Sequence, residues 1–207
     1  MLESFIEWEV AHQTLTGQKE SGDSYLVKAF DNSVLVAVVD GLGHGAEAAA
    51  AAKIAVSTLG ANPRNNVISM FQKSHEALRQ SRGVVMSVAL MNGADATATW
   101  MGVGNVEGVL VRSNPDIKPQ KESLLIRAGV VGGQLPALHA SMIPIMPGDT
   151  LAFATDGIVS SFSEKINSHD PPAEIATSIL ANHTKGSDDA LVLVARVWTH
   201  PNESPRT

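Results

Sequence analysis

The chain has 207 residues, a length typical of one domain, and 44% of them are hydrophobic, enough to build a full core. Charged residues make up 17% and the net charge is −6, which argues against disorder and against a basic surface for nucleic acid or anionic membrane. The absence of cysteine excludes disulfides, zinc–thiolate sites and a cysteine nucleophile. We therefore expect a cytoplasmic protein whose partners are proteins or metal ions.

The beginning of the chain is not typical of a targeting segment. The first ten residues hold three glutamates and no basic residue, so we expect no signal peptide. No apolar run approaches the roughly 18–20 residues that a membrane helix needs. We expect residues 1–199 to form a single domain, followed by a polar tail at 200–207.

Strand-like segments dominate the chain. Two pairs of them flank turn residues, Asp31-Asn32-Ser33 and Asn92-Gly93, and the latter two residues both tolerate positive φ. Hairpins of this kind favour antiparallel sheets over a doubly wound parallel sheet. The expected strands are residues 6–10, 24–30, 34–39, 84–91, 97–101, 106–112, 124–127, 150–154 and 190–198.

Three helices are expected among these strands, at residues 46–59, 66–80 and 171–181. The first is rich in alanine and is predicted to stop before Gly60. The second has Asn65 or Asn66 as its N-cap, and the third has Asp170. The pattern predicts an α+β fold in which antiparallel sheets are covered by a few helices.

The sharpest chemical feature is an apolar strand that ends at Asp40, passes through three glycines and enters a helix. Gly41-x-Gly43-x-x-Ala46 formally matches a dinucleotide-binding fingerprint. That fingerprint requires an acidic residue roughly 20 residues further on, and none occurs between Glu47 and Glu76. A role for Asp40 in binding a metal ion is the better interpretation.

Other carboxylates also stand where apolar strands begin or end. Asp156 follows one strand and precedes a glycine, Asp188 and Asp189 precede another strand, and Asp23 enters a third. A single Asp-Gly pair is ordinarily a turn signal. In antiparallel sheets, however, one strand's end lies beside its neighbour's beginning, so the whole set can converge at one rim.

Such a cluster of unpaired carboxylates predicts a metal centre. Aspartates at close range repel one another and raise each other's pKa. A hard divalent cation removes that penalty, and oxygen ligands suit Mg²⁺ or Mn²⁺. Two such ions about 3.5–4 Å apart activate a water and clamp a phosphoryl group.

These residues resemble the metal-dependent serine/threonine protein phosphatases of type 2C, also called the PPM family. The resemblance implies a sandwich of two antiparallel β-sheets flanked by helices (αββα), with two Mn²⁺ or Mg²⁺ ions at one edge. It covers nearly the whole chain, in the family's order. The matching motifs are Ser21-Gly22-Asp23, Val39-Asp40-Gly41-Leu42-Gly43-His44-Gly45, Ala154-Thr155-Asp156-Gly157 and Ser187-Asp188-Asp189.

The resemblance also implies roles for the matching residues. Asp40 would bridge the two metals and Gly41 would ligate one of them through its carbonyl oxygen. Asp156 and Asp188 would complete the ligands of one metal, and Asp23 would sit at the second through water. With these ligands in place, a metal-activated water would attack the phosphoryl group.

Two further residues are secondary candidates. Asp189 would support the site by hydrogen bonding, although it competes with its neighbour as the direct ligand. His44 lies four residues after Asp40, and it is either a general acid for the leaving oxygen or a residue of the loop and helix start.

The Asp-Gly-Leu-Gly-His-Gly form is similar to the bacterial SpoIIE-like branch of the family. That branch acts on phosphorylated STAS-domain proteins in sigma-factor control. Because this chain is short and carries no sensor region, it resembles the free-standing stressosome phosphatases, which reset the stress response. The implied partners are phosphorylated STAS-domain or other regulatory proteins, with no nucleic acid and no membrane.

The chain departs from the family pattern at two places. No arginine precedes Arg64, so the phosphate-gripping arginine of larger members is missing. Asn105 stands where some bacterial members have an aspartate that holds a third metal. Two other functions compete with a phosphoprotein phosphatase. One is a pseudophosphatase that binds a partner, although such a protein normally loses metal-binding acids and all four motifs here retain theirs. The other is a metal-dependent hydrolase of small phosphate esters.

Overall fold

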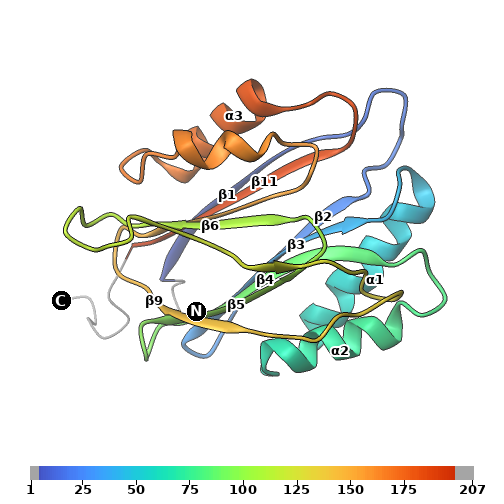
Figure 1. Ribbon diagram of the computed structural model, residues 1–207, viewed down its shortest axis with the longest axis horizontal. Coiled ribbons are helices and arrows are strands. Elements are labelled where there is room, and N and C mark those ends of the chain that lie inside the picture. Colours follow the sequence, from blue (N-terminus) through green and yellow to red (C-terminus); the bar gives the residue numbers. More distant parts are fainter. Residues whose placement is uncertain (1–4, 199–207) are drawn as a thin grey trace.

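Two β-sheets lie face to face in the computed structural model, which describes residues 5–198, and helices cover the outer face of each sheet (Figure 1). The polar tail expected at 200–207 lies outside the described residues. In the first sheet the strand order is β1 (Ile6–Gln13), β11 (Ala190–Val197), β10 (Thr150–Ala154), β6 (Glu107–Val111) and β7 (Lys121–Ser123). In the second sheet it is β2 (Asp23–Phe30), β3 (Ser33–Gly41), β4 (Val84–Asn92), β5 (Thr97–Val103) and β8 (Ile126–Arg127), and β9 (Ser141–Pro144) also pairs with β5.

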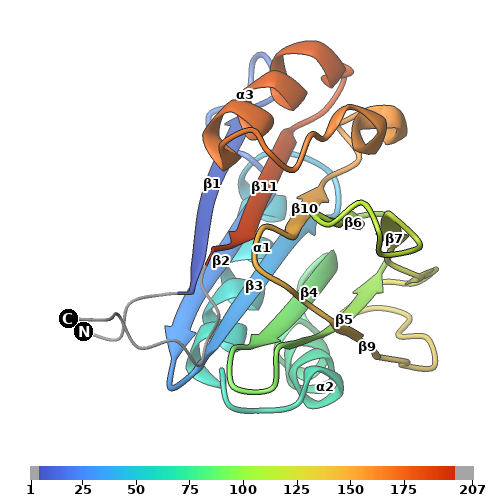
Figure 2. The same cartoon turned by 90° about the vertical axis from the view of Figure 1, so that its left-hand side faces the viewer.

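Pairing within both sheets is antiparallel except between β5 and β8, which run parallel. Helices α1 (Ala46–Ala61) and α2 (Val67–Ala77) pack on the second sheet, and α3 (Pro172–His183) packs on the first (Figure 2). A short 3₁₀ helix, η1 (Ser160–Lys165), lies beside α3. The α+β sandwich of antiparallel sheets flanked by helices is therefore confirmed.

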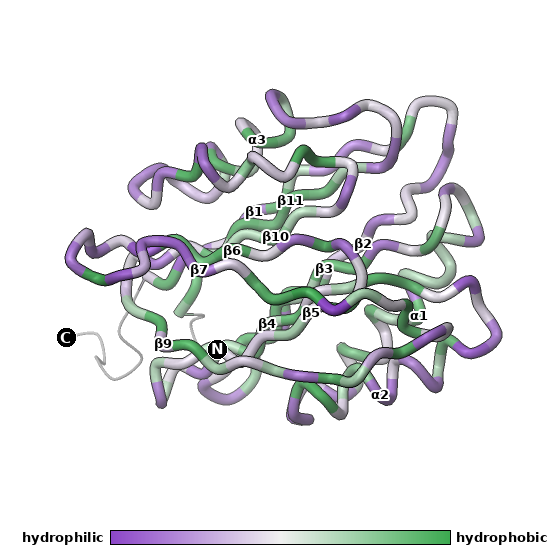
Figure 3. Tube along the Cα trace, viewed as in Figure 1, coloured by the Kyte–Doolittle hydropathy of each residue, from purple (hydrophilic) through white to green (hydrophobic). Residues whose placement is uncertain are grey.

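The alternation of side chains along the strands produces three layers of core. In β3, Val34, Val36 and Val38 point between the two sheets, whereas the intervening residues 35, 37 and 39 face α1 and α2. A third cluster lies between the first sheet and α3. Figure 3 shows the consequence, with hydrophobic residues along the strands and hydrophilic residues in the outer loops. Strands buried on both faces read as continuous apolar runs, which is why they were readily recognised in the sequence.

The second hairpin forms, but its turn differs from the expected one. Asn92 belongs to β4, and its side-chain oxygen accepts hydrogen bonds from the N–H groups of Ala94 (2.9 Å) and Asp95 (3.3 Å). The residue with positive φ is Ala96, at 51°. The hairpin that Asn92-Gly93 predicted is confirmed, but the positive φ falls on Ala96, because the asparagine side chain builds a longer, four-residue connection.

Helix boundaries also differ from the expected ones. Helix α1 continues through Gly60 to Ala61, because one glycine in a last turn carries only a small penalty of about 1 kcal/mol. Asn66 caps α2, since its side chain accepts the Ser69 N–H at 2.8 Å. The expected cap by Asp170 is wrong, because Pro171 occupies the N-cap position of α3 and no side chain bonds to the helix end.

The segment between β6 and β10 was the least predictable. A single strand at 124–127 was expected, but β7 and β8 are separate, and buried Leu124 marks the passage of the chain from the first sheet to the second. Strands β7 to β9 are only two to four residues long, too short for a periodic signal. Helix η1 was not expected either.

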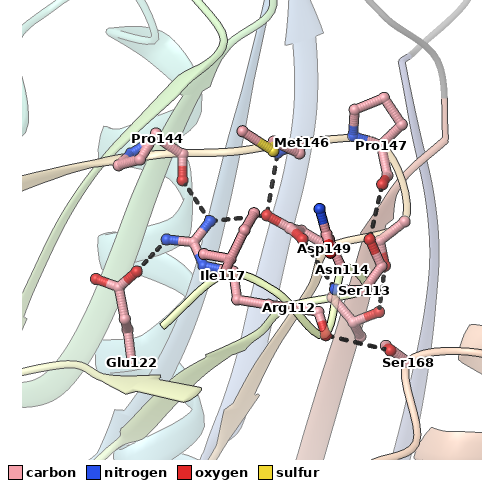
Figure 4. A network of polar contacts seen from close by, with 12 residues as sticks. Arg112, Ser113, Asn114, Ile117, Glu122, Pro144, Met146, Pro147, Asp149 and Ser168 are labelled. Carbon is pink, nitrogen blue, oxygen red and sulfur yellow. Dashed lines mark hydrogen bonds and ion pairs between the residues drawn. The ribbon is translucent and has the colours of Figure 1, made fainter. Parts of the chain in front are cut away.

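A buried arginine holds this irregular segment together (Figure 4). Arg112, just after β6, donates to Asp149 Oδ2 at 2.8 Å and to the Pro144 carbonyl at 2.7 Å, and it also pairs with Glu122. Asp149 in turn accepts the N–H groups of Ser113 and Met146. Charges buried in this way are stabilising only when they are paired, and this network joins three separate stretches of chain.

Candidate active site

Asp23 and Asp40 lie directly opposite each other in the second sheet. Asp23 is the first residue of β2, Asp40 is next to last in β3, and the antiparallel register pairs the two. The long apolar run of β3 is buried on both faces, so the strand holds Asp40 firmly at the rim of the sandwich. The expected meeting of one strand's end with its neighbour's beginning is thus observed for this pair.

The first sheet contributes carboxylates to the same rim. Asp156 follows β10, and Asp188 and Asp189 precede β11, which pairs with β10 in antiparallel fashion. The hydroxyl of Thr155 donates to Asp23 Oδ2 at 2.8 Å, and this hydrogen bond links the two sheets directly at the cluster. The structure therefore brings all five aspartates of the matching motifs together.

Close backbone contacts explain the glycines after Asp40 and Asp156. A Cβ on Gly41 would overlap the Ala48 carbonyl in α1, and a Cβ on Gly157 would overlap the Asp189 carbonyl. Neither glycine has a positive φ. Glycine is therefore required after each aspartate because another segment approaches the backbone closely. It is not required for a turn with a positive φ.

The neighbours Asp188 and Asp189 have different environments. Asp189 is buried, and its two oxygens accept the N–H groups of Leu15 and Gly22, each at 2.7 Å. Asp188 is half-buried and accepts only the adjacent Asp189 N–H within the described part of the chain, at 2.9 Å. Asp188 therefore keeps an oxygen free for a ligand, while Asp189 anchors the segment that leads into β2.

Burial and mutual repulsion raise the pKa values of the clustered carboxyls. Desolvation, followed by the charges of the other four aspartates, raises the pKa of Asp40 to about 8. Desolvation raises the pKa of Asp23 to about 7, although the hydrogen bond from Thr155 opposes this. The pKa of Asp156 is raised by desolvation and by Asp188. These carboxyls thus ionise reluctantly when no cation accompanies them.

Two polar residues contact Asp156 that the sequence did not identify as partners. The Asn105 side-chain amide donates to Asp156 Oδ2 at 2.7 Å, and the Lys185 ammonium donates to the Asp156 backbone carbonyl at 2.6 Å. Asn105 lies in the connection from β5 to β6, where the chain changes sheets. The sequence marked Asn105 only as a departure from the family, and it held no signal for Lys185.

His44 lies in the exposed connection between β3 and α1. Within the described part of the chain its imidazole has no hydrogen bond and no ion pair. The connection is held instead by the Leu42 N–H, which donates to the Gly83 carbonyl at 3.1 Å, and by an ion pair between Arg82 and Glu47. These contacts favour the loop role for His44.

The chemistry of the cluster suits a hard divalent cation, since all five of its acidic side chains offer carboxylate oxygens, the ligands that such ions prefer. Within residues 5–198, however, no three His, Asp or Glu side chains are already arranged to hold a metal ion. The carboxylates fit such an ion by type and position, and they would have to draw closer around it.

Comparison with known proteins identifies the family. The family model described as Stage II sporulation protein E (SpoIIE) matches residues 31–198. The chain belongs to the SpoIIE family. The match covers β3 to β11 and therefore includes Asp40, Asp156 and Asp188.

Individual relatives agree with this membership of the SpoIIE family. The chain is 26% identical over 187 residues to phosphoserine phosphatase RsbX of Bacillus subtilis (strain 168), covering 87% of this chain and 89% of that protein. A chain from a structural study of the bacterial stressosome, described as a modular system adapted to control secondary messenger signaling, has a TM-score of 0.83 and 26% identity, covering 92% of this chain and 99% of that one. A crystal structure of RsbX in complex with magnesium has a TM-score of 0.82 and 23% identity, with coverage of 93% and 95%.

The resemblance to the bacterial branch of the type 2C phosphatases is therefore confirmed, as is the sandwich fold. Among the helices that the structure describes, none combines the length and apolar character needed to cross a membrane.

Proposed function

We propose that this chain is a metal-dependent serine/threonine phosphoprotein phosphatase. The observation that carries the proposal is the convergence of five aspartates from both sheets at one rim, with the pKa of Asp40 raised to about 8 and that of Asp23 to about 7. Such an accumulation of carboxyls is unfavourable unless cations neutralise it. Two Mg²⁺ or Mn²⁺ ions fit this role, and the related RsbX was crystallised with magnesium.

Each of the clustered residues would have its own role in holding the two ions. Asp40 would bridge the two ions, Gly41 would contribute its carbonyl oxygen, and Asp156 and Asp188 would complete one ligand set. Asp23, whose carboxylate is oriented by Thr155, would serve the second ion through water. When bound, the ions would activate a water and polarise the phosphoryl group.

Supporting residues keep the ligands in place. Asp189 would act as an anchor rather than a ligand, because both of its oxygens already accept backbone N–H groups. Asn105 would hold the Asp156 carboxylate in one orientation through its amide. His44 remains a second candidate for a proton donor from the exposed loop, although its surroundings favour the loop role.

We further propose that the substrates are phosphorylated regulatory proteins, specifically STAS-domain proteins of a stressosome, in the cytoplasm. The similarity to RsbX and to a chain from the bacterial stressosome supports this assignment. Residues 1–199 would form the single phosphatase domain that carries it out.

The test compares hydrolysis of an aryl phosphate and of a phosphoserine STAS protein with Mn²⁺ and with chelator. Asp40→Asn should abolish both activities, because the bridging carboxylate is lost. Asp116→Asn is the matched control, since Asp116 lies in the exposed loop after β6. Full activity in chelator or in Asp40→Asn would overturn the two-metal mechanism.

The same assay separates the competing functions. A pseudophosphatase would bind the phosphoprotein without hydrolysing it under any metal condition. A hydrolase of small esters would turn over metabolites faster than phosphoproteins, and mass spectrometry of candidate scaffold proteins would find their phosphate retained.

A further inference from the structure

Lys185 places a positive charge beside the aspartate cluster. It lies in the segment between α3 and β11, and its ammonium donates to the Asp156 backbone carbonyl at 2.6 Å. Its side chain is exposed. The electrostatic influence of this ammonium reaches the Asp156 carboxyl, where it partly opposes the upward shift of the pKa.

The local backbone does not depend on the Lys185 ammonium. The Lys185 N–H already donates to the Gly157 carbonyl at 2.8 Å, and the Val159 N–H donates to the His183 carbonyl at 2.8 Å. A β-bridge between Ile158 and Thr184 adds to these contacts. The segment that carries Lys185 is thus also attached to the turn after β10 through main-chain contacts, so the ammonium can exchange its partner without releasing the segment.

Lys185 lies close to the Asp156 carboxyl but forms no direct ion pair with a carboxylate of the described residues. Other cations near the first helix do form ion pairs: Arg82 pairs with Glu47, and Lys53 pairs with Glu20. A lysine ammonium on a flexible stem is well suited to bind a phosphate as a point charge. A phosphate approaching five aspartates needs such cations, and no arginine precedes Arg64 to provide one.

We propose that Lys185 binds the phosphoryl group of the substrate, exchanging the Asp156 carbonyl for a phosphate oxygen when the substrate enters. The proposal rests on the proposed phosphatase function and adds a substrate-binding residue to it. No covalent step involves Lys185, because its role is to attract and orient the dianion next to the carboxylate cluster.

A matched control is available elsewhere in the chain. The Lys121 ammonium donates to the Ser163 carbonyl at 2.5 Å and is exposed, so it makes the same kind of contact outside the cluster. If lysine–carbonyl contacts are only surface features, Lys185→Ala and Lys121→Ala should behave alike.

The experiment uses the full chain with saturating Mn²⁺ and p-nitrophenyl phosphate. For Lys185→Ala we expect KM, and the inhibition constant of inorganic phosphate, to rise about tenfold or more, the scale of one hydrogen bond to a charged group. Lys185→Arg should retain most of the binding, and Lys121→Ala should match the wild type. Calorimetry should show unchanged Mn²⁺ affinity and weaker binding of inorganic phosphate to the Mn²⁺-loaded variant.

Each result decides one of the two proposals. If the wild type hydrolyses the ester but Lys185→Ala equals Lys121→Ala, the Lys185 proposal is wrong and the phosphatase function stands. If Lys185→Ala loses Mn²⁺ affinity while its KM is unchanged, Lys185 positions Asp156 and does not bind substrate. If the wild type hydrolyses no phosphate ester with Mn²⁺, the proposed function fails first, and the Lys185 proposal fails with it.

Discussion

Asp188 and Asp189 are adjacent, yet the structure places them in different surroundings. The strand pattern did not distinguish them, because both precede the same apolar strand, and the choice of Asp188 as the ligand rested on the family resemblance. The distinction comes from residues far away in the chain, since the Leu15 N–H reaches Asp189 from the end of β1 and the Gly22 N–H from the start of β2 in the other sheet. The sequence around β11 does not indicate that these two N–H groups bind Asp189.

This difference predicts opposite effects of two asparagine substitutions. Asp189→Asn should lower the free energy of unfolding in chelator by about 1–3 kcal/mol, because one of two buried N–H donors would face an amide NH₂ group. Asp188→Asn should leave that free energy unchanged or higher, since repulsion is relieved, but should weaken Mn²⁺ binding at least tenfold. Denaturant unfolding and calorimetry measure the two quantities. Loss of Mn²⁺ affinity with unchanged stability in Asp189→Asn would reverse the assignment.

At the scale of elements, the long strands and helices were predictable and the short ones were not. Strand β10 was placed correctly at both ends, and α1 at its start, because apolar runs and an alanine-rich stretch are strong local signals. The end of α1 was wrong, because Gly60 was interpreted as a terminator. The helix is stabilised there by tertiary packing instead, and the Leu26 side chain lies 3.9 Å from the position of a Cβ at Gly60.

The continued helix predicts that Gly60→Ala stabilises the protein. Ordinary van der Waals contact is available for the added methyl, and alanine in a helix is favoured over glycine by up to about 1 kcal/mol. Thermal unfolding should therefore shift upward. Gly157→Ala is the contrasting variant, because its Cβ would overlap the Asp189 carbonyl and should lower the unfolding temperature. A destabilised Gly60→Ala would mean that the helix ends before this residue.

For the whole molecule, the sandwich and the convergence of acids at one rim were predictable, and the links between the sheets were not. The Thr155 hydroxyl on Asp23 crosses from one sheet to the other, and the Asn105 amide reaches Asp156 from the connection that joins the sheets. Both depend on the way the sheets stack, which strand periodicity does not encode. The roles of the individual site residues remain predictions.

The raised carboxyl pKa values couple folding to pH and metal. In the absence of cations, the folded chain holds protons on Asp23 and Asp40 up to about pH 7 and 8, whereas the unfolded chain releases them near pH 4. The folded state therefore binds more protons across this window, and these two groups make stability fall as pH rises through it. Metal ions that bind the ionised carboxylates should reverse the trend.

We accordingly expect the unfolding temperature in chelator to fall between pH 5 and pH 8 more steeply for the wild type than for Asp40→Asn, which cannot ionise at that position. Added Mn²⁺ should stabilise the wild type more at pH 8 than at pH 6. Thermal scans over this pH range measure both effects. Parallel curves for the wild type and Asp40→Asn in chelator would show that ionisation of Asp40 does not contribute to the pH dependence of stability.

Strand β11 is the last strand that the structure describes, and it is also the neighbour of the first, β1. In the described structure β1 pairs with β11 alone, so the backbone groups of β1 that face β11 have no partner strand until β11 has been synthesised. Asp188 and Asp189 arrive with the same segment. A nascent chain that has not yet reached residue 188 therefore lacks both this strand and part of the candidate metal site. A product truncated before that point should show no metal-dependent hydrolysis of a phosphate ester.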